Sequence, residues 1–578
     1  MADILQQYAK AREALIAEDR RLRRDSSRES SEVELKADKV VRDIRAAEAV
    51  SVWWAEHPDI PHPFPGMEFL TGKSVIVKTE IFKILSKMPK GGLLHAHLDA
   101  TVDVKCLLSL AYKHPALHIR VPEAVHAASI HTLLPEFKAF PKQEHSEVLE
   151  LAQSPMQWVQ LSKARETFPA ELGGAQGFDK WLTASMMINP SEAYGTHNTV
   201  AKIWQKFTNT FSVASCLTRY APIFRDYVRE FLLTSIADGI SYVEPRINFR
   251  HRFMDDIDGN ECVPHREWLV MFDEVLKEVK EDMRKQGRED EFIGAKIIYT
   301  TLRFITPEEL TWYTEDCIAL KKEFPHLIAG FDLVGNENEL KPLIDYLEPL
   351  LQFQERQKEE GVEIPFLFHA GETFGDGTEA DMNMYDAILL GTKRIGHGFS
   401  LVRHPRLMEI CRERGIALEV CPISNEILRL TSSMPTHPLP ILFNNGVPVA
   451  LCCDDPSIFG NMGLTFDFYQ VLVSSEVTGL VQLAEVARDS IKYSMLDPEE
   501  KQHALECWER QWAKFVQDIP GSSPPSTSVQ TRLLSQPKSK GARKGYRGWR
   551  IYVLCWLVKT TSPSISQTHP PQAIFPTS

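Results

Sequence analysis

Short runs of apolar and β-branched residues recur along the central part of the chain, and longer segments with helical periodicity separate them. In one of these segments Trp268, Phe272, Val275 and Val279 fall on one helical face. This alternation predicts an α/β fold made of βα units around a parallel sheet. The predicted strands span residues 93–97, 241–247, 294–299, 328–333, 365–369, 394–397, 417–421 and 448–452.

Eight strands are the number that closes a TIM (β/α)8 barrel. The spacing departs from a regular barrel at one place, because about 140 residues separate the first two strands where a βα unit needs a few tens. We therefore predict an insertion between strands 1 and 2, at about residues 100–200. Residues 134–143 have the composition of a loop, while 204–217 and 223–239 have helical periodicity.

The two ends of the chain differ from this pattern. Residues 1–50 contain no Gly or Pro and are rich in Ala, Glu, Arg and Leu, which predicts an exposed helical arm. After residue 519 Ser, Pro, Thr, Gln and basic residues dominate, which predicts disorder. The predicted domains are a helical N-terminal extension at 1–87, the barrel at 88–518 with its insertion, and a disordered C-terminal tail at 519–578.

Composition excludes several classes of partner. The net charge of -13 and the pI near 5.9 argue against a nucleic-acid binder, which needs clustered Lys and Arg. No run approaches the roughly 20 apolar residues of a membrane span. The charged N-terminus lacks the apolar region of a signal peptide, so we expect a cytoplasmic protein. The scattered cysteines indicate reduced thiols rather than a disulfide framework.

Polar residues that can bind metals occur at the carboxyl ends of four predicted strands, the face where TIM barrels carry their active sites. His95 and His97 share one face of the first strand, because side chains alternate with a period of two. Taken singly, each residue has a structural explanation, such as capping an element or forming a turn. Their recurrence at one end of the barrel favours a shared site. The other residues are His369 and Glu372 after strand 5, His397 after strand 6, and Asp454 and Asp455 after strand 8.

Three histidines and one carboxylate make a mixed nitrogen and oxygen ligand set that leaves room for water, as catalytic zinc sites do. Such an ion lowers the pKa of its bound water and so supplies hydroxide near neutral pH. Glu372 and His397 are the available acid and base groups on neighbouring loops. The spacing alone leaves other choices of ligand open.

The segments that carry these residues resemble the adenosine deaminase family, in particular its adenosine-deaminase-related growth factor branch. They are MPKGGLLHAHLD, FHAGET, RIGHGF, EVCPISN and LCCDDPSIFG. Similar segments without catalytic residues, including IWQKF, YAPIFRDYV, IAGFDLVGNE and DFYQVL, extend the resemblance over about residues 88–518. Members of that branch are typically secreted and disulfide-bonded. This chain shows neither a signal sequence nor an obvious paired-cysteine insertion, which counts against an extracellular signalling role.

The resemblance assigns roles to the matching positions. It implies four ligands for one Zn²⁺ per subunit, namely His95, His97, His369 and Asp454. His397 would help to deprotonate and orient the attacking water. Glu372 would protonate the purine N1 while hydroxide adds to C6, and the tetrahedral intermediate would expel ammonia to give inosine.

The same resemblance implies four substrate contacts. Asp455 would hydrogen-bond near N7, and the backbone N–H of Gly335 would approach N3. Asp99 falls where many adenosine deaminases place an acid that contacts the ribose, although the growth-factor branch has its acid directly after the second His; the alternative is a turn. Trp204 falls in a motif that contributes to the nucleoside pocket, and the alternative is a core aromatic. For Asp332 a structural role is an equal alternative.

We therefore expect zinc-dependent hydrolytic deamination of adenosine and 2'-deoxyadenosine. The alternatives are another adenine derivative as substrate, such as adenine, AMP or N6-substituted adenosine, and a nucleoside-binding signalling protein without catalysis. AMP would need a phosphate cradle, and the sequence locates none. The expected partner is a small purine nucleoside, with no nucleic acid and no membrane, and the helical arm is a candidate contact for a homodimer.

Overall fold

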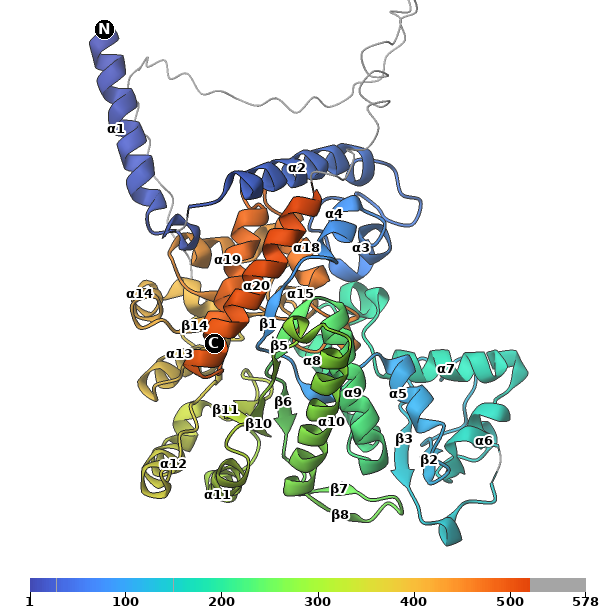
Figure 1. The fold of residues 1–578 in the computed structure, drawn as a ribbon. Coiled ribbons are helices and arrows are strands. Elements are labelled where there is room, and N and C mark those ends of the chain that lie inside the picture. The colour runs from blue at the N-terminus through green and yellow to red at the C-terminus, as the bar shows by residue number, and fades with distance from the viewer. Residues whose placement is uncertain (28, 149, 520–578) are drawn as a thin grey trace, which may run out of the picture. The chain divides into compact units, whose positions relative to one another are not determined.

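The computed structural model describes residues 1–27, 29–148 and 150–519, which belong to one compact unit. The tail predicted at 519–578 lies outside the described residues, apart from its first one. Every strand predicted from the apolar runs overlaps at least one observed strand, although 93–97 and 365–369 each do so at a single residue (Figure 1). In chain order these are β1 (Gly91–Leu93), β5 and β6 (Ile240–Val243, Arg246–Asn248), β9 and β10 (Gly294–Ala295, Ile297–Leu302), β11 (Ile328–Val334), β12 (His369–Ala370), β13 (Arg394–His397), β14 (Ala417–Val420) and β15 (Val449–Leu451).

These strands close into a parallel barrel, which confirms the predicted fold class. β1 pairs with β5 and β5 with β9, β6 pairs with β10 and β10 with β11, and β12 to β15 pair in order. Single parallel bridges join the remaining seams, at Phe331 with Phe366 and at Ala96 with Asp454. The regular strand β1 ends at Leu93, near the beginning of the strand predicted at 93–97. The residues after it pair only through single bridges, at Ala96 and His97.

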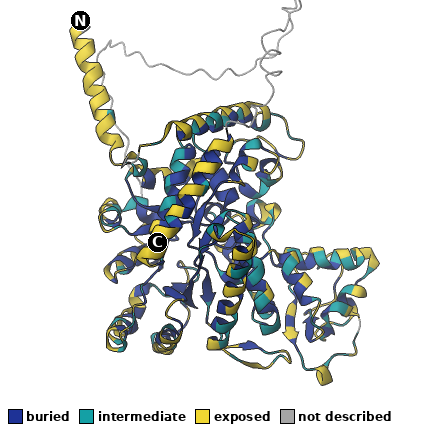
Figure 2. Ribbon diagram, in the orientation of Figure 1, coloured by how far each residue is buried: buried dark blue, intermediate teal, exposed yellow. Residues whose placement is uncertain are grey.

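Helices surround the barrel and bury their apolar stripes against it. In α10 (His265–Lys285) the predicted face of Trp268, Phe272, Val275 and Val279 is buried. The strands themselves are buried along both faces, as parallel barrel strands are (Figure 2). The other outer helices are α9 (Ala221–Ala237), α11 (Pro307–Glu323), α12 (Leu347–Glu360), α13 (Glu379–Leu389), α14 (Pro405–Arg414), α16 (Leu439–Asn444), α18 (Thr465–Val473), α19 (Leu480–Lys492) and α20 (Pro498–Asp518).

The segment between the first two barrel strands forms an additional layer beside the barrel (Figure 1). It contains α5 (Val104–Ala111), a three-stranded antiparallel sheet, α6 (Leu161–Glu166), α7 (Gly174–Ser185) and α8 (Val200–Thr218). The sheet consists of β2 (Leu117–Arg120), β3 (Glu136–Ala139) and β4 (Val159–Gln160). The helices predicted at 204–217 and 223–239 are confirmed as α8 and α9.

The prediction of a loop at 134–143 is wrong, because these residues include the strand β3. All four residues of β3 pair with β2; Glu136 and Lys138 are exposed, whereas Phe137 and Ala139 are buried. Only four residues alternate between polar and apolar here, and prolines stand on both sides, so the sequence alone favours a loop. Pairing with β2, about 20 residues earlier, makes the segment the edge strand of a sheet.

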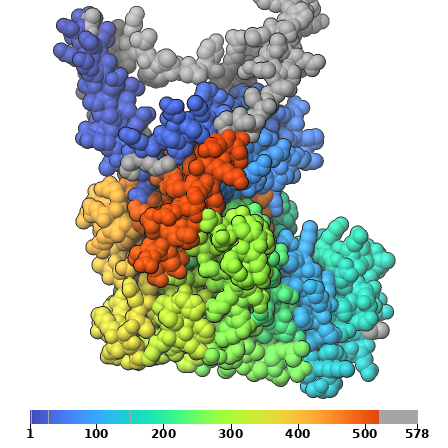
Figure 3. All heavy atoms as spheres, in the orientation of Figure 1, coloured from blue at the N-terminus to red at the C-terminus, as the bar shows by residue number. Residues whose placement is uncertain are grey.

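The described residues before the barrel include the α-helices α1 (Ala2–Arg20), α2 (Glu32–Glu48), α3 (Phe69–Ile76) and α4 (Glu80–Leu85). α1 is exposed along its length (Figure 2), whereas α2 packs against α19 and α20. Figure 3 shows α20 on the surface of the unit, beside the blue segment that contains α2. Among the described residues, no helix has both the length and the apolar composition that crossing a membrane requires.

Candidate active site

The first and last barrel strands bring two histidines to one carboxylate. Nε2 of His95 lies 3.3 Å from Oδ1 of Asp454, and Nε2 of His97 lies 3.4 Å from the same oxygen. Backbone hydrogen bonds join these strand ends in both directions, from the His97 N–H to the Asp454 carbonyl and from the Asp454 N–H to the His95 carbonyl. Three of the predicted ligands therefore converge at the barrel mouth.

The third histidine is oriented by a buried acid. His369 Nδ1 lies 2.6 Å from Oδ2 of Asp332, and the His369 backbone N–H donates to Oδ1 of the same residue. Asp332 also accepts a hydrogen bond from Nε of Arg246. These contacts give it a structural role, which was one of the two alternatives for this residue. The nitrogens of His95, His97 and His369 that could bind a metal lie within 4.8 Å of one another.

Glu419 plays the corresponding part for His95. Its Oε2 lies 2.7 Å from His95 Nδ1 and accepts from Nη2 of Arg246, while its Oε1 accepts from Nε of Arg394. All four side chains are fully buried. Burial alone would raise the pKa of Glu419, but Arg246 and Arg394 hold it well below its usual value. Carboxylates in this position fix the ring orientation and tautomer of metal-binding histidines.

His397 is held by a chain of three hydrogen bonds from α16 and α15 (Pro422–Ile427). The Leu439 N–H donates to His437 Nδ1, so His437 carries its proton on Nε2, which donates to the Asn425 carbonyl oxygen. The Asn425 amide N–H then faces His397 Nδ1 at 3.3 Å. In its neutral form His397 therefore carries its proton on Nε2.

Nε2 of His397 lies 3.6 Å from Oε1 of Glu372 and 3.9 Å from Oδ2 of Asp454. Burial, followed by the neighbouring histidines, lowers the pKa of His397 well below its usual value, although Asp454 opposes this shift. His397 is thus a neutral donor aimed at the centre of the site.

Glu372 is buried on the loop after β12. Glu337 accepts hydrogen bonds from the backbone N–H groups of Gly371 and Glu372 and thereby fixes this loop. Burial, and then the charges of Asp454 and Glu337, raises the pKa of Glu372 well above its usual value. A carboxyl group in this setting keeps its proton and can donate it.

A cavity of about 590 Å³ opens onto these groups. Its lining includes all the other predicted site residues, namely Asp455, Gly335, Asp99 and Trp204, together with His97, His369, Glu372, His397 and Asp454. His95 lies deeper, behind the lining. The volume is in the range of small-molecule sites. The predicted pocket residues therefore share one cavity, while the roles assigned to them remain predictions.

Two pocket residues have polar atoms without partners. Oδ1 of Asp455 and Nε1 of Trp204 are buried and form no hydrogen bond within the described part of the chain. Burial, and then the charge of Asp454, raises the pKa of Asp455 well above its usual value. Both groups are therefore free to contact a ligand. Gly335 has a φ of 113°, which favours glycine, and a Cβ there would lie 2.5 Å from Cδ1 of Leu340, so that side chain would have to move.

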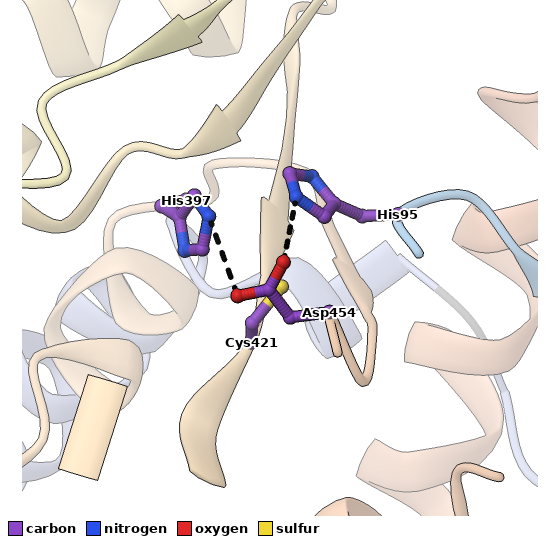
Figure 4. Close-up of side chains that lie close together, drawn as sticks. All are labelled: His95, His397, Cys421 and Asp454. Atoms are coloured by element: carbon purple, nitrogen blue, oxygen red, sulfur yellow. Dashed lines mark ion pairs between the residues drawn. The ribbon is translucent and has the colours of Figure 1, made fainter. Parts of the chain in front are cut away.

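The structure also tests whether the residues fit a zinc ion. Nε2 of His95 is buried and has no hydrogen bond, and the two nitrogen to oxygen separations of 3.3 and 3.4 Å match neighbouring ligands of a tetrahedral zinc site. Figure 4 shows a fourth group, Cys421, beside His95, His397 and Asp454. Cys421 could offer its sulfur to an ion held by His95, His397 and Asp454, so it is an alternative ligand that the sequence did not indicate. The donor set of three histidines and Asp454 fits zinc.

Backbone strain coincides with this site. His397 and Asp454 have φ angles of 58° and 61°, in the left-handed region that non-glycine residues rarely adopt. Such conformations cost roughly 1–3 kcal/mol each and cluster at active sites. They turn the two side chains inward from the last residue of β13 and from the loop after β15.

Sequence reasoning missed the supporting residues. Glu419 lies in the middle of the apolar strand β14, and a charged residue in a buried strand was the available signal. Gly396 gave no signal. A Cβ at that position would lie 3.0 Å from His95 and 3.2 Å from His369, so glycine makes room for the paired rings.

Comparison with known proteins gives one consistent picture. The family model described as adenosine deaminase matches residues 188–508. Adenosine deaminase 2 of Sus scrofa is 35% identical over 462 residues, which cover 79% of this chain and 84% of the relative. The adenosine deaminase of Phlebotomus duboscqi is 33% identical, covering 79% of this chain and 82% of the relative. Among solved structures, the adenine deaminase of Arthrobacter aurescens superposes with a TM-score of 0.50 at 17% identity, over 74% of this chain and 99% of that one, which bears on the fold alone.

Proposed function

The chain belongs to the adenosine deaminase family, in its growth-factor branch, and we propose that it deaminates adenosine and 2'-deoxyadenosine hydrolytically. The products would be inosine, or 2'-deoxyinosine, and ammonia. The observation that carries the proposal is the arrangement of Glu372, which is buried in the cavity beside His397 and Asp454 and whose pKa burial raises.

His95, His97, His369 and Asp454 would hold the zinc ion. When bound, zinc acts as a Lewis acid that makes water nucleophilic near neutral pH. The supporting carboxylates Asp332 and Glu419 keep the outer nitrogens of two of these rings engaged, so that the free nitrogens stay aimed at the site.

Glu372 would donate its proton to the ring nitrogen of the purine as C6 becomes tetrahedral. His397 points an N–H at the place between Glu372 and Asp454, which supports the orienting part of its predicted role. The deprotonating part has no such support, because the hydrogen bond from Asn425 occupies the other ring nitrogen. Oδ1 of Asp455 has no partner, and burial raises the pKa of this carboxyl group, which supports a contact between Asp455 and N7 of the purine.

A direct assay tests the proposal. Purified, zinc-supplemented protein should convert adenosine to inosine with release of one ammonia per nucleoside, followed by the fall in absorbance near the adenosine maximum and by chromatography of the product. Folded protein that contains zinc but produces neither inosine nor ammonia would instead favour the non-catalytic nucleoside-binding alternative.

A further inference from the structure

The cavity extends beyond the groups that a nucleoside would engage. One face of α8 lines it, through residues spaced three or four apart that include Trp204, Phe207, Phe211, Ser215 and Arg219. The face is aromatic toward the beginning of the helix and polar, then basic, at its end. Its aromatic part adjoins the catalytic loops, since the Phe207 ring stacks on Phe459, 5.5 Å away, just after the loop that carries Asp455.

Three basic side chains meet at the polar end of this cavity. Arg219 follows the last turn of α8, and Arg250 and His251 follow β6, the second half of barrel strand 2. Within the described residues, none of the three forms an ion pair with a carboxylate. Arg219 makes only long contacts, of 3.4 Å, to the Ser215 hydroxyl and the Phe253 carbonyl, and the Arg250 guanidinium lies 4.7 Å above the Phe304 ring.

The surrounding acids do not neutralise this charge. Asp255 does not line the cavity; the charge of Arg219 acts on it, but the two do not reach ion-pair distance. Apart from Asp99 and the catalytic acids, the acid that the described lining contains is the exposed Glu339. Burial, and then the charges of Arg219 and Arg250, lowers the pKa of His251 to about 4. A positive field therefore persists at this end of the cavity.

The basic cluster lies farther along α8 than the residues beside Asp99, the acid expected at the ribose. Asp99 and Phe211 border a small void and also line the cavity, and Arg219 follows Phe211 by eight residues on the same face of α8, or about 12 Å along the helix axis. On the strand side, His97 pairs with Arg246, and Arg250 comes four residues later on the loop that leaves the barrel. A group attached to the ribose would extend toward these side chains from both directions.

We propose that Arg219, Arg250 and His251 form a subsite for a phosphate ester on the ribose, so that adenine nucleotides are preferred to free nucleosides as substrates. Arginine suits this task because its planar donors match phosphate oxygens and stay charged at every physiological pH. The inference rests on the proposed deamination for its reaction, and on the cavity lining for its specificity. It supplies the phosphate cradle that the sequence did not locate.

The test compares kcat/KM for adenosine, 5'-AMP and 3'-AMP in phosphate-free buffer. We expect at least one nucleotide to exceed adenosine by about 10-fold or more, because charge-assisted hydrogen bonds to phosphate are among the stronger polar contacts. The two nucleotides identify which ribose position carries the phosphate. The double variant Arg219→Gln/Arg250→Gln should lower the ratio of nucleotide to adenosine kcat/KM by about 10- to 100-fold.

Arg252→Gln is the matched control. Arg252 is adjacent in sequence and loses the same charge, but it packs over the Trp312 ring at 4.2 Å and does not line the cavity. It should leave the ratio within about 2-fold, as an exposed surface change does. A double variant that behaves like this control would overturn the subsite, as would a wild-type protein that prefers adenosine to both nucleotides.

A binding measurement separates the two proposals. Calorimetry of inosine and its 5'- and 3'-monophosphates needs no turnover, and tighter binding of a monophosphate, weakened by the double variant, would support the subsite even in a protein that deaminates nothing. Equal binding of inosine and both monophosphates would refute it. Absence of turnover with every substrate refutes the deamination only.

Discussion

At the scale of single residues, the site depends on buried acids whose protonation differs between neighbours. Burial alone would raise the pKa of Asp454, but His397 and the contacts from His95 and His97 lower it well below the usual value. Burial, followed by the charge of Asp454, raises the pKa values of Glu372 and Asp455. Environments that separate the pKa values of adjacent carboxyl groups are how one site supplies both a ligand and a proton donor. The donor role of Glu372 is the most direct consequence.

Glu372→Gln should lower kcat by about 10²- to 10⁴-fold, because the amide keeps the shape of the side chain but has no transferable proton. The zinc content, measured by elemental analysis, should stay unchanged, since Glu372 is not among the proposed ligands. Glu379→Gln, an exposed change at the start of α13, is the control and should retain full activity. Full activity in Glu372→Gln would show that another group donates the proton.

Glu426 gives a pH dependence of stability that is separate from catalysis. It is buried in α15, accepts from the Phe69 N–H at the start of α3 and from the Tyr194 hydroxyl, and leaves Oε1 without a partner. Burial raises its pKa to about 8. The folded state therefore binds a proton that the unfolded state releases between about pH 4.5 and 8, so this group stabilises the fold most at low pH and loses that contribution as the pH rises.

Relative to Glu426→Gln, the free energy of unfolding of the wild-type protein should fall by about 1.4 kcal/mol per pH unit across this window. Urea unfolding of both proteins at several pH values from 5.5 to 8 measures the difference. Glu413 is exposed, so the free energy of unfolding of Glu413→Gln should change with pH as that of the wild type does. A difference between wild type and Glu426→Gln that does not change with pH would contradict the assignment.

At the scale of elements, the N-terminal extension divides into two parts. α1 is exposed along most of its length, with Ile4, Tyr8 and Leu15 each more than 60% exposed, while α2 buries Ala37, Val41 and Ile44. α2 is also tied to the end of the barrel, because the Trp512 indole N–H donates to Glu34. The predicted arm is therefore α1 alone, and α2 belongs structurally to the barrel. The domain boundary expected at residue 87 stays a prediction.

Ile44→Ala should lower the free energy of unfolding by about 2–5 kcal/mol, because it empties a buried position in α2. Val33→Ala on the same helix, where the side chain is 39% exposed, should change it by less than about 0.5 kcal/mol. Chemical unfolding measures both. Similar effects at the two positions would show that α2 does not pack on the barrel in solution.

Deletion of residues 1–20 tests the predicted homodimer contact without disturbing α2. We expect light scattering to give a dimer for the full chain and a monomer for the shortened chain, with the unfolding midpoint of the monomer unchanged. A shortened chain that keeps the mass of the full one would remove α1 from the interface. The deletion is more informative than removal of residues 1–85, which would also strip α2 from α19 and α20.

At the scale of the whole molecule, strands 1, 5 and 8 of the barrel must close on one point before the site exists. An ion that binds only the folded state stabilises it, by about 4 kcal/mol when its concentration is a thousand times Kd. We expect one zinc per chain, and we expect a chelator to remove both activity and part of the resistance to urea. Added zinc should restore both properties.

His97→Ala is the control for zinc removal, since it deletes a proposed ligand that is partly exposed and does not contribute to the buried Asp332 and Glu419 networks. This variant should contain little zinc and should respond to the chelator much less than the wild type. Undiminished activity of metal-free wild-type protein would refute the zinc dependence.

The sequence by itself determined the barrel and the positions of its strands, because hydrophobic periodicity and burial are local signals that each segment carries alone. It also identified the residues at the strand ends, since a barrel brings every strand end to one face. Only the tertiary structure decided what surrounds those residues. Asp332 and Glu419 became supports for histidines, β3 became a strand, and Arg219 and Arg250 line one cavity. Each of these outcomes depends on partners far away in the chain. Contacts of that kind produce no periodic pattern in the sequence, so the sequence alone does not predict them.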